Sequence, residues 1–149
     1  MLNALPRRAL LAALLAMAVA LPGCGSKDDA KKADEKKAEV AKPDPLKIGF
    51  IYVGPTGDAG WTFAHDNARK ALEQEFGDRI KTSFVESVPE GPDSERVVRD
   101  LVGQGNKLIF GTTFGYMETM LKVAEETKGV RFEHATGYKS AENMRTYDS

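Results

Sequence analysis

The sequence has little cysteine, histidine or tryptophan: one Cys, two His and one Trp among 149 residues. A single cysteine excludes a disulfide within the chain, and two histidines leave few ligands for a zinc site. Neither charge dominates, since 21 Lys and Arg stand against 22 Asp and Glu. Nucleic-acid-binding domains carry a strongly basic face, so this balance argues against such a partner. We therefore expect no metal site and no nucleic-acid interface.

Long apolar runs are also scarce, and the one uninterrupted run is Ala9–Leu21. It is shorter than the about 20 residues that a membrane-spanning helix needs. Arg7 and Arg8 precede it, and small residues follow it. A basic start, a short apolar centre and small residues are typical of a secretory signal. A buried core helix is the alternative, but nothing before Leu46 is suited to pack around one. We predict an export signal over residues 1–23.

The end of this signal, Leu21-Pro22-Gly23-Cys24, resembles the lipobox of bacterial lipoproteins. In that motif the cysteine thiol takes a diacylglycerol and becomes the first residue of the mature protein. Cleavage after Ala18-Val19-Ala20 is the alternative, and it would leave Cys24 as a free thiol. The residues that follow are mostly Lys, Asp, Glu and Ala, without an apolar face. Such a segment acts as a solvated leash. We therefore expect a lipid anchor at Cys24 and a charged flexible tether over residues 24–45.

From Leu46 onward, β-rich and helical patterns alternate. The predicted strands are Leu46–Val53, Ile80–Val85, Lys107–Phe110 and Val130–Ala135. The predicted helices are Thr62–Phe76, a helix capped by Asp93 or Ser94, and Tyr116–Thr127. Strands that alternate with helices at this spacing give an α/β fold with a parallel sheet and right-handed crossovers. The sequence ends at Ser149 within what we expect to be a further helix, and we interpret it as truncated.

The first predicted helix is amphipathic. Its apolar face contains Phe63, Asn67, Ala68, Ala71, Leu72 and Phe76. Its polar face contains Asp66, Arg69, Lys70 and Glu73. We expect the apolar face to pack on the sheet and Gly77 to cap the carboxyl end of the helix.

Three loops that follow predicted strands are candidates for a binding site. They are Gly54–Thr62, Glu86-Ser87 and Gly111–Tyr116. In an open parallel sheet, ligands bind outside the carboxyl ends of the strands, near the switch in strand order. Glycine lets the backbone approach a ligand closely. We therefore expect these loops to meet at one edge and to form the site.

The glycine spacing does not match a nucleotide-binding motif. Gly54, Gly57 and Gly60 are three apart, which fits neither G-x-G-x-x-G nor G-x-x-x-x-G-K-[ST]. Together with Glu86 the loop weakly imitates a dinucleotide site, so a nucleotide-dependent oxidoreductase is the enzyme alternative. Export argues against it, because nicotinamide cofactors are mostly cytoplasmic. No nucleophile–base–acid set can be assembled, so we expect no catalytic residue and no cofactor.

Trp61 lies at the turn from the first strand into the first helix. Two interpretations are equally open: a lid packed on the sheet edge, or an aromatic platform for a flat ligand. Phe114 in the third loop has the same two interpretations. His65 follows Trp61 by four residues and can share its helix face; we interpret it as a partly exposed polar residue. His134 lies within a predicted strand, where we expect a structural role.

Four segments, in this order and spacing, resemble the basic membrane protein family. They are Lys47–Tyr52, Gly57–Thr62, Val85–Ser87 and Leu108–Gly115. Members are substrate-binding lipoproteins of ABC importers, related to purine-nucleoside receptors. The resemblance implies a parallel-sheet lobe of the type I periplasmic-binding-protein kind. Because members have two lobes with the ligand between them, it also implies that residues 46–149 form part of the first lobe and that the second is missing.

The resemblance further implies roles for single residues. In purine-nucleoside members the loop after the first strand reads Asp-x-Ser-Phe-Asn, where Phe stacks on the base and Asn bonds its edge. Asp58–Thr62 occupies that loop, so Trp61 is expected to stack on the ligand and Thr62 to replace the Asn. The expected ligand-binding set is Asp58, Trp61, Thr62, Glu86, Phe114 and Gly115.

The function that the resemblance implies is capture without chemistry. The protein would be exported, anchored by lipid and facing the periplasm or cell exterior. It would bind a small aromatic polar solute, a purine nucleoside or nucleobase, and deliver it to an ABC permease. A ligand-sensing domain that signals to a receptor is the alternative. With one lobe only, we expect residues 46–149 to bind such a ligand weakly.

Overall fold

The computed structural model describes residues 42–148. The strands are β1 (Leu46–Ile51), β2 (Ile80–Val85), β3 (Leu108–Gly111), β4 (Arg131–Ala135) and β5 (Met144–Tyr147). The helices are α1 (Trp61–Phe76), α2 (Pro92–Gly103) and α3 (Met117–Glu126), with short 3-10 turns at Gly77–Arg79 and Phe114–Tyr116. The predicted export signal, the lipidation of Cys24 and nearly all of the predicted tether lie outside the described residues.

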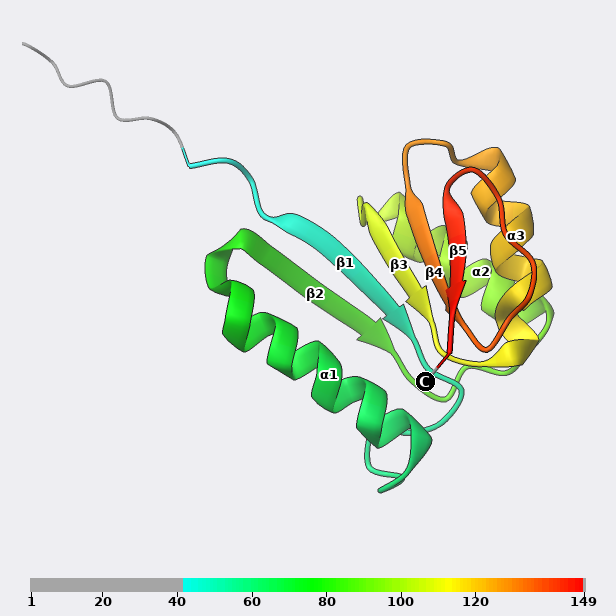
Figure 1. The fold of residues 1–149 in the computed structure, drawn as a ribbon, viewed down its shortest axis with the longest axis horizontal. Coiled ribbons are helices and arrows are strands. Elements are labelled where there is room, and N and C mark those ends of the chain that lie inside the picture. Colours follow the sequence, from blue (N-terminus) through cyan, green and yellow to red (C-terminus); the bar gives the residue numbers. More distant parts are fainter. Residues whose placement is uncertain (1–41, 149) are drawn as a thin grey trace, which may run out of the picture. The chain divides into compact units, whose positions relative to one another are not determined.

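The five described strands form one parallel sheet in the order β2-β1-β3-β4-β5. Helix α1 covers one face, while α2 and α3 lie together on the other (Figure 1). The α/β prediction is therefore confirmed. The chain moves from β1 outward to β2 and then returns past β1 to β3, so the strand order reverses between β1 and β3. This reversal creates a topological switch point at the carboxyl ends of these two strands.

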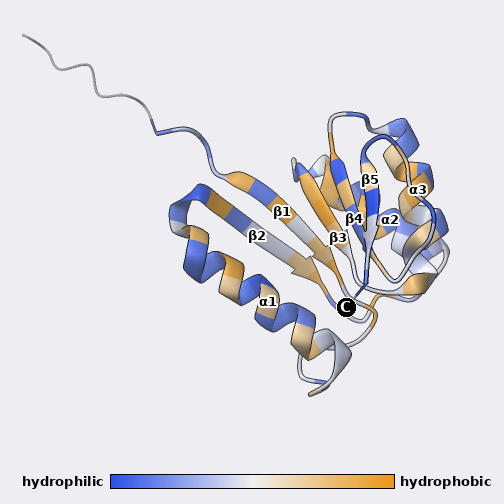
Figure 2. Ribbon diagram, in the orientation of Figure 1, coloured by the Kyte–Doolittle hydropathy of each residue, from blue (hydrophilic) through white to orange (hydrophobic). Residues whose placement is uncertain are grey.

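The larger core lies between the sheet and the α2–α3 layer. Burial of apolar area of this kind contributes roughly 25 cal/mol per Å². The middle strand β3 is among the most uniformly apolar elements (Figure 2). Ile109 and Gly111 are buried, whereas Leu108 and Phe110, on the α1 side, are half-buried. The fully or nearly buried members of this core are Ile51, Val88, Val97, Val98, Leu101, Ile109, Tyr116, Met120, Val123, Ala124, Val130, Phe132 and Met144.

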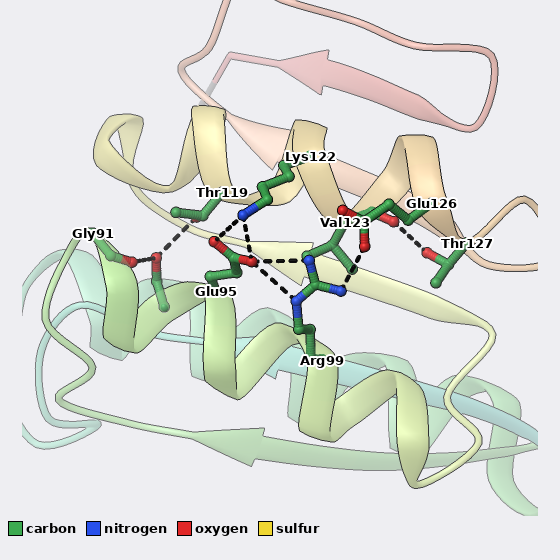
Figure 3. A network of polar contacts seen from close by, with 9 residues as sticks. Gly91, Glu95, Arg99, Thr119, Lys122, Val123, Glu126 and Thr127 are labelled. Carbon is green, nitrogen blue, oxygen red and sulfur yellow. Dashed lines mark hydrogen bonds and ion pairs between the residues drawn. The ribbon is translucent and has the colours of Figure 1, made fainter.

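An ion-pair network joins α2 to α3 on the outer side of this layer (Figure 3). The Arg99 guanidinium lies 2.8 Å from a Glu95 oxygen and 2.7 Å from a Glu126 oxygen. Lys122 Nζ lies 2.9 Å from Glu95. The hydrogen bonds that Arg99 donates to Glu126 and Glu95 raise the pKa of Arg99. The hydrogen bonds that Glu95 and Glu126 accept hold the pKa of each carboxyl below its ordinary value. The network links two consecutive crossover helices, so it favours one relative placement of them.

Helix α1 packs with a different face than the sequence predicts. Asp66 and Arg69 are buried, whereas Phe63 and Phe76 are 44% and 38% exposed. Arg69 Nε donates to Asp66 Oδ1 at 2.8 Å, and its Nη1 donates to Thr82 Oγ1 of β2 at 2.9 Å. The predicted apolar packing face is therefore wrong. The reason is that β2 offers a polar partner beneath the helix, so a hydrogen-bonded ion pair fills the contact instead of apolar side chains.

The residues after β4 form a fifth strand and not the expected helix. Met144–Tyr147 pairs in parallel with β4, with Phe132 opposite Met144. Within residues 42–148 no helix connects these two strands. The Asn143 amide fixes the connection instead, because its Nδ2 donates to the carbonyls of Ala124, Thr127 and Val130. The strand is short and largely polar, with Met144 as its one fully buried residue, so its pattern is too weak to distinguish from a helix.

The element ends agree with the sequence to within about two residues, with one exception. The amino-terminal cap of helix α2 is Gly91, two or three residues before the predicted Asp93 or Ser94. Pro92 lies in the first turn, where a backbone N–H would have no helical acceptor, so the proline loses no hydrogen bond there. Ser94 Oγ donates to the Gly91 carbonyl at 2.7 Å. Gly77 caps α1 with a φ of 51°, as predicted. No helix in the described part of the chain is long and apolar enough to cross a bilayer.

Candidate functional site

The loops after β1, β2 and β3 meet at the carboxyl edge of the sheet, as the sequence predicts, because the strands are parallel. Backbone hydrogen bonds tie them together. Ser87 N donates to the Gly54 carbonyl at 3.1 Å, and Thr112 N donates to the Ile51 carbonyl at 3.3 Å. The last strand, β5, also ends at this edge (Figure 1). The structure thus brings the predicted site residues to one end of the sheet, around the switch point.

Asp58 holds the amino end of α1. Its carboxylate accepts hydrogen bonds from the backbone N–H groups of Gly60 at 2.8 Å, Thr62 at 3.0 Å and Phe63 at 2.9 Å. These bonds, that from Gly60 first, hold the pKa of Asp58 below its ordinary value. A carboxylate here satisfies N–H groups that lack helical partners and complements the helix dipole. Asp58 therefore orders the loop before Trp61, and its direct contact with a ligand stays a prediction.

Glu86 performs a similar task between two loops. Its Oε2 accepts a hydrogen bond from Thr56 N at 2.8 Å. This bond holds the pKa of Glu86 below its ordinary value. The contact fixes the glycine loop after β1 against the segment that leaves β2. Its predicted role toward a ligand is not tested by this geometry.

Trp61 is the first residue of α1 and reaches across to the loop after β3. Its indole Nε1 donates to the Thr112 carbonyl. The centroid of the His65 ring lies 4.7 Å from the centroid of the indole ring, so the two residues share a helix face as predicted. The side chain is nevertheless 40% exposed. One edge of the ring is held by the protein while part of its surface stays open, so packing and ligand stacking are compatible roles.

Thr62 points into the protein. It is fully buried, and its hydroxyl has no hydrogen-bond partner among the described residues. A Cβ added at Gly54 would lie 3.1 Å from Thr62 Oγ1, so the glycine makes room for this side chain. The ligand role predicted for Thr62 remains a prediction, and in this arrangement the protein encloses its side chain.

Phe114 and Gly115 begin the turn that leads into α3. Phe114 is 53% exposed. A Cβ added at Gly115 would lie 2.0 Å from the carboxyl carbon of Glu90, so a side chain there would require the exposed Glu90 side chain to move. Thr113 Oγ1 donates to Glu90 Oε1 at 2.9 Å. Sequence reasoning missed Glu90, since only the fold brings the segment before α2 against the loop after β3.

His134 lies within β4 and is fully buried, which agrees with the predicted structural role. Its Nε2 donates to the Thr113 carbonyl at 2.7 Å. Burial holds the pKa of His134 below its ordinary value, although this hydrogen bond opposes the shift. A Cβ added at Gly137 would lie 2.1 Å from His134 Nδ1, so the loop after β4 rests on the imidazole ring. His134 thus links the loops that follow β3 and β4.

Tyr138 is the second residue at this edge that the sequence did not indicate. It is 73% exposed, and its ring centroid lies 6.2 Å from that of Phe114. No pattern in the sequence pairs these two rings, because they come from different loops.

Two apolar grooves lie along α1, and the first includes His65 and Thr112, which also contact Trp61. One of about 360 Å³ is lined by Phe50, Ala64, His65, Ala68, Arg69, Leu72, Phe110, Thr112 and Tyr147. The other, of about 400 Å³, is lined by Leu46, Ile48, Leu72, Phe76, Arg79, Ile80, Leu108 and Phe110. Neither is lined by a predicted ligand-binding residue. Among residues 42–148, no group of three or more His, Cys, Asp or Glu side chains is placed to hold a metal ion.

Residues 46–148 match the protein family described as ABC transporter substrate-binding protein PnrA-like. The chain belongs to this family. The match covers the whole described sheet, so the family that the sequence motifs indicated is confirmed.

Two curated relatives extend this finding. The chain is 54% identical over 106 residues to a purine-binding protein of Brucella abortus (strain 2308), covering 71% of this chain and 30% of the relative. It is 41% identical over 104 residues to a Haloferax volcanii protein named as an ABC transporter glucose-binding protein, covering 70% of this chain and 26% of that one. The chain therefore spans less than a third of the length of these relatives.

A solved structure shows the same fold. The solute-binding protein of an ABC transporter system from Conexibacter woesei aligns with a TM-score of 0.61 at 19% identity. The alignment covers 69% of this chain and 35% of that structure. At this identity the likeness establishes the fold alone, and it agrees with the parallel-sheet lobe expected from the sequence.

Proposed function

We propose that the protein containing this chain captures a purine base or nucleoside outside the cytoplasm and delivers it to an ABC permease. The single observation that carries the proposal is the placement of two partly exposed aromatic rings, Trp61 and Phe114, on either side of the switch point. Ligands of open parallel sheets bind at this location. The name of the Brucella abortus relative supports a purine as the solute.

The surroundings of these rings suit a binding site. Asp58 and Glu86 hold the loop before Trp61, and Glu90 holds the loop that carries Phe114. A site that is ordered before the ligand arrives loses less free energy on binding. Aromatic faces favour flat, polarisable rings, so a purine fits better than an aliphatic solute.

The two relatives differ in the ligands that their names give, purine and glucose. The purine assignment is supported by the higher identity, 54% against 41%, and by the aromatic character of the edge. Sugars also lie on aromatic side chains, so the choice requires a direct comparison of the two ligands.

Export and lipid anchoring complete the proposal. Membership of an ABC substrate-binding family supports a location outside the cytoplasm, and the signal pattern before Cys24 supports an anchor there. We propose no chemical step: the protein binds a solute, and closure over the ligand signals to the transporter.

Replacing Cys24 with Ser should release the protein from membranes or block its processing. A mature N-terminus at Leu21 with an unmodified Cys24 thiol would contradict the lipid anchor.

The test of ligand class is a calorimetric titration of the protein that contains this chain. Adenine, adenosine, guanosine, inosine and glucose are titrated under one condition. We expect at least one purine to bind with a Kd of about 1 μM, near −8 kcal/mol, and glucose to give no heat. Binding of glucose without binding of any purine would overturn the ligand class.

A further inference from the structure

We propose that Tyr138 and Phe114 together form a stacking platform for the planar ring of the ligand, with Tyr138 as a ligand-binding residue. This inference rests on the proposed function and assigns part of the same edge. It starts from one observation. The two rings come from loops after different strands, and their centroids are 6.2 Å apart with an interplanar angle of 36°.

Their exposure is the first argument. Tyr138 is 73% exposed and Phe114 is 53% exposed. Aromatic side chains bury large areas when a core is available, so two adjacent exposed rings indicate a surface that another molecule covers. The location specifies which molecule, because this edge is where parallel α/β sheets bind small ligands.

The backbone beneath Tyr138 is held in place, which is the second argument. Tyr138 N lies 3.4 Å from Met117 Sδ, and Thr136 N donates to the Tyr147 carbonyl at 2.8 Å. The neighbouring Lys139 Nζ contacts Glu118 at 2.6 Å. The loop is therefore anchored on both sides of an exposed ring, so the ring can bind with little loss of backbone freedom.

The buried His134 couples the two halves of the platform. Its Nε2 donates to the Thr113 carbonyl, next to Phe114, and Gly137, next to Tyr138, lies against the same imidazole. A side chain at position 137 would displace the ring. This shared support fixes the distance between Phe114 and Tyr138 without any contact between their own backbones.

The geometry specifies the ligand chemistry. The two rings already contact each other within the range of aromatic pairs, so a ligand stacks on their outer surfaces and is not inserted between them. A flat heteroaromatic ring such as a purine gains from this arrangement. An aliphatic solute of similar size gains only the free energy of burying its apolar surface, without the additional stacking between aromatic rings.

The experiment compares Tyr138→Ala, Tyr138→Leu and Tyr138→Phe in the protein that contains this chain. Adenosine and inosine are titrated by calorimetry, and stacking is followed by the loss of purine absorbance in the ultraviolet. Phe76→Ala is the matched control, because Phe76 is an exposed aromatic residue at the opposite end of α1. We expect the Ala and Leu variants to weaken purine binding by about 3- to 10-fold and to reduce the absorbance change.

The Tyr138→Phe and Phe76→Ala variants should stay within about twofold of the unchanged protein. Unchanged affinity in the Ala variant with folding intact would overturn the platform, as would equal losses in the Phe and Ala variants. Failure of the unchanged protein to bind any purine would instead refute the proposed function, so the two failures are distinguishable.

Discussion

At the scale of single residues, the side chains at the carboxyl edge of the sheet have two roles. Some hold the loops in place by hydrogen bonds, and others expose aromatic rings to solvent. Three carboxylates accept hydrogen bonds from the protein itself. Asp58 and Glu86 accept them from backbone N–H groups, and Glu90 accepts one from a hydroxyl. A backbone carbonyl holds the indole N–H of Trp61, and the rings of Trp61 and Phe114 are partly exposed. Sequence motifs located four of these five residues, because they adjoin predicted strands. Glu90 was missed, since its contacts depend on which loops the fold brings together.

Substitutions of Trp61 test its predicted stacking. Aromatic stacking is worth about 0.5–1.5 kcal/mol beyond area burial, so Trp61→Ala should weaken purine binding several-fold. Trp61→Phe should keep most of the affinity, although it loses the bond to the Thr112 carbonyl. Calorimetric titration measures both variants. An alanine variant that folds normally and binds with unchanged affinity would leave Trp61 with a packing role alone.

Asp58 gives a prediction about pH. Its pKa is lower in the folded protein than its ordinary value of 3.8 because it accepts backbone hydrogen bonds. A carboxyl with a lowered folded-state pKa stabilises the fold above its unfolded pKa, and this contribution is lost as pH falls through the folded value. Urea midpoints of the unchanged protein and of Asp58→Asn should therefore differ at pH 7, and the difference should shrink as pH falls below the ordinary pKa of 3.8. A constant difference across this range would contradict a charged cap.

At the scale of elements, α1 shows where periodicity fails. The pattern correctly gave a helix that ends before Gly77, but it assigned the wrong face to the sheet. Hydrophobic periodicity carries no information about a polar partner on a neighbouring strand, here Thr82. The fifth strand was missed for a related reason, because a short segment with one fully buried residue has no clear period. Elements with several buried apolar residues, such as α3, were located well.

The buried Asp66–Arg69 pair makes a stability prediction. Arg69→Met leaves the Asp66 carboxylate buried with only Lys70 as an ionic partner. Breaking a buried pair from one side should lower the free energy of unfolding by about 3 kcal/mol. Lys70→Met is the matched control. Because Lys70 is exposed, this substitution should lower the free energy of unfolding by less than about 1 kcal/mol. Urea unfolding followed by circular dichroism measures both, and equal losses would show that the pair is not a buried anchor.

At the scale of the whole molecule, the fold class followed from the alternation of strands and helices alone. The order of the strands comes from the structure, because the right-handed crossover rule fixes only the face on which each connecting helix lies. Ligand identity does not follow from these rules, because many solutes are bound by similar folds. The purine proposal therefore depends on a few exposed rings and on the relative with the higher identity.

The residues described here form one edge against which a ligand can lie. A site that encloses a small ligand buries most of its surface and needs a second wall. We therefore expect a fragment from Lys27 to Ser149 to bind purines with a Kd above about 10 μM, more than about tenfold weaker than a closed site. Calorimetry on the purified fragment tests this. Binding near about 1 μM or tighter by a monodisperse, cooperatively unfolding fragment would show that one lobe suffices.

The central claim is that a purine is held at the carboxyl edge, around Trp61, Phe114 and Tyr138. Chemical-shift mapping by NMR tests it most directly, with adenosine added in steps to the isotope-labelled protein that contains this chain. We predict the largest shifts at the indole N–H of Trp61 and at the backbone amides of Phe114 and Tyr138. Amides near Leu72 and Phe76, along the apolar grooves, should hardly move. Shifts concentrated along those grooves, with the three aromatic residues unaffected, would contradict the account.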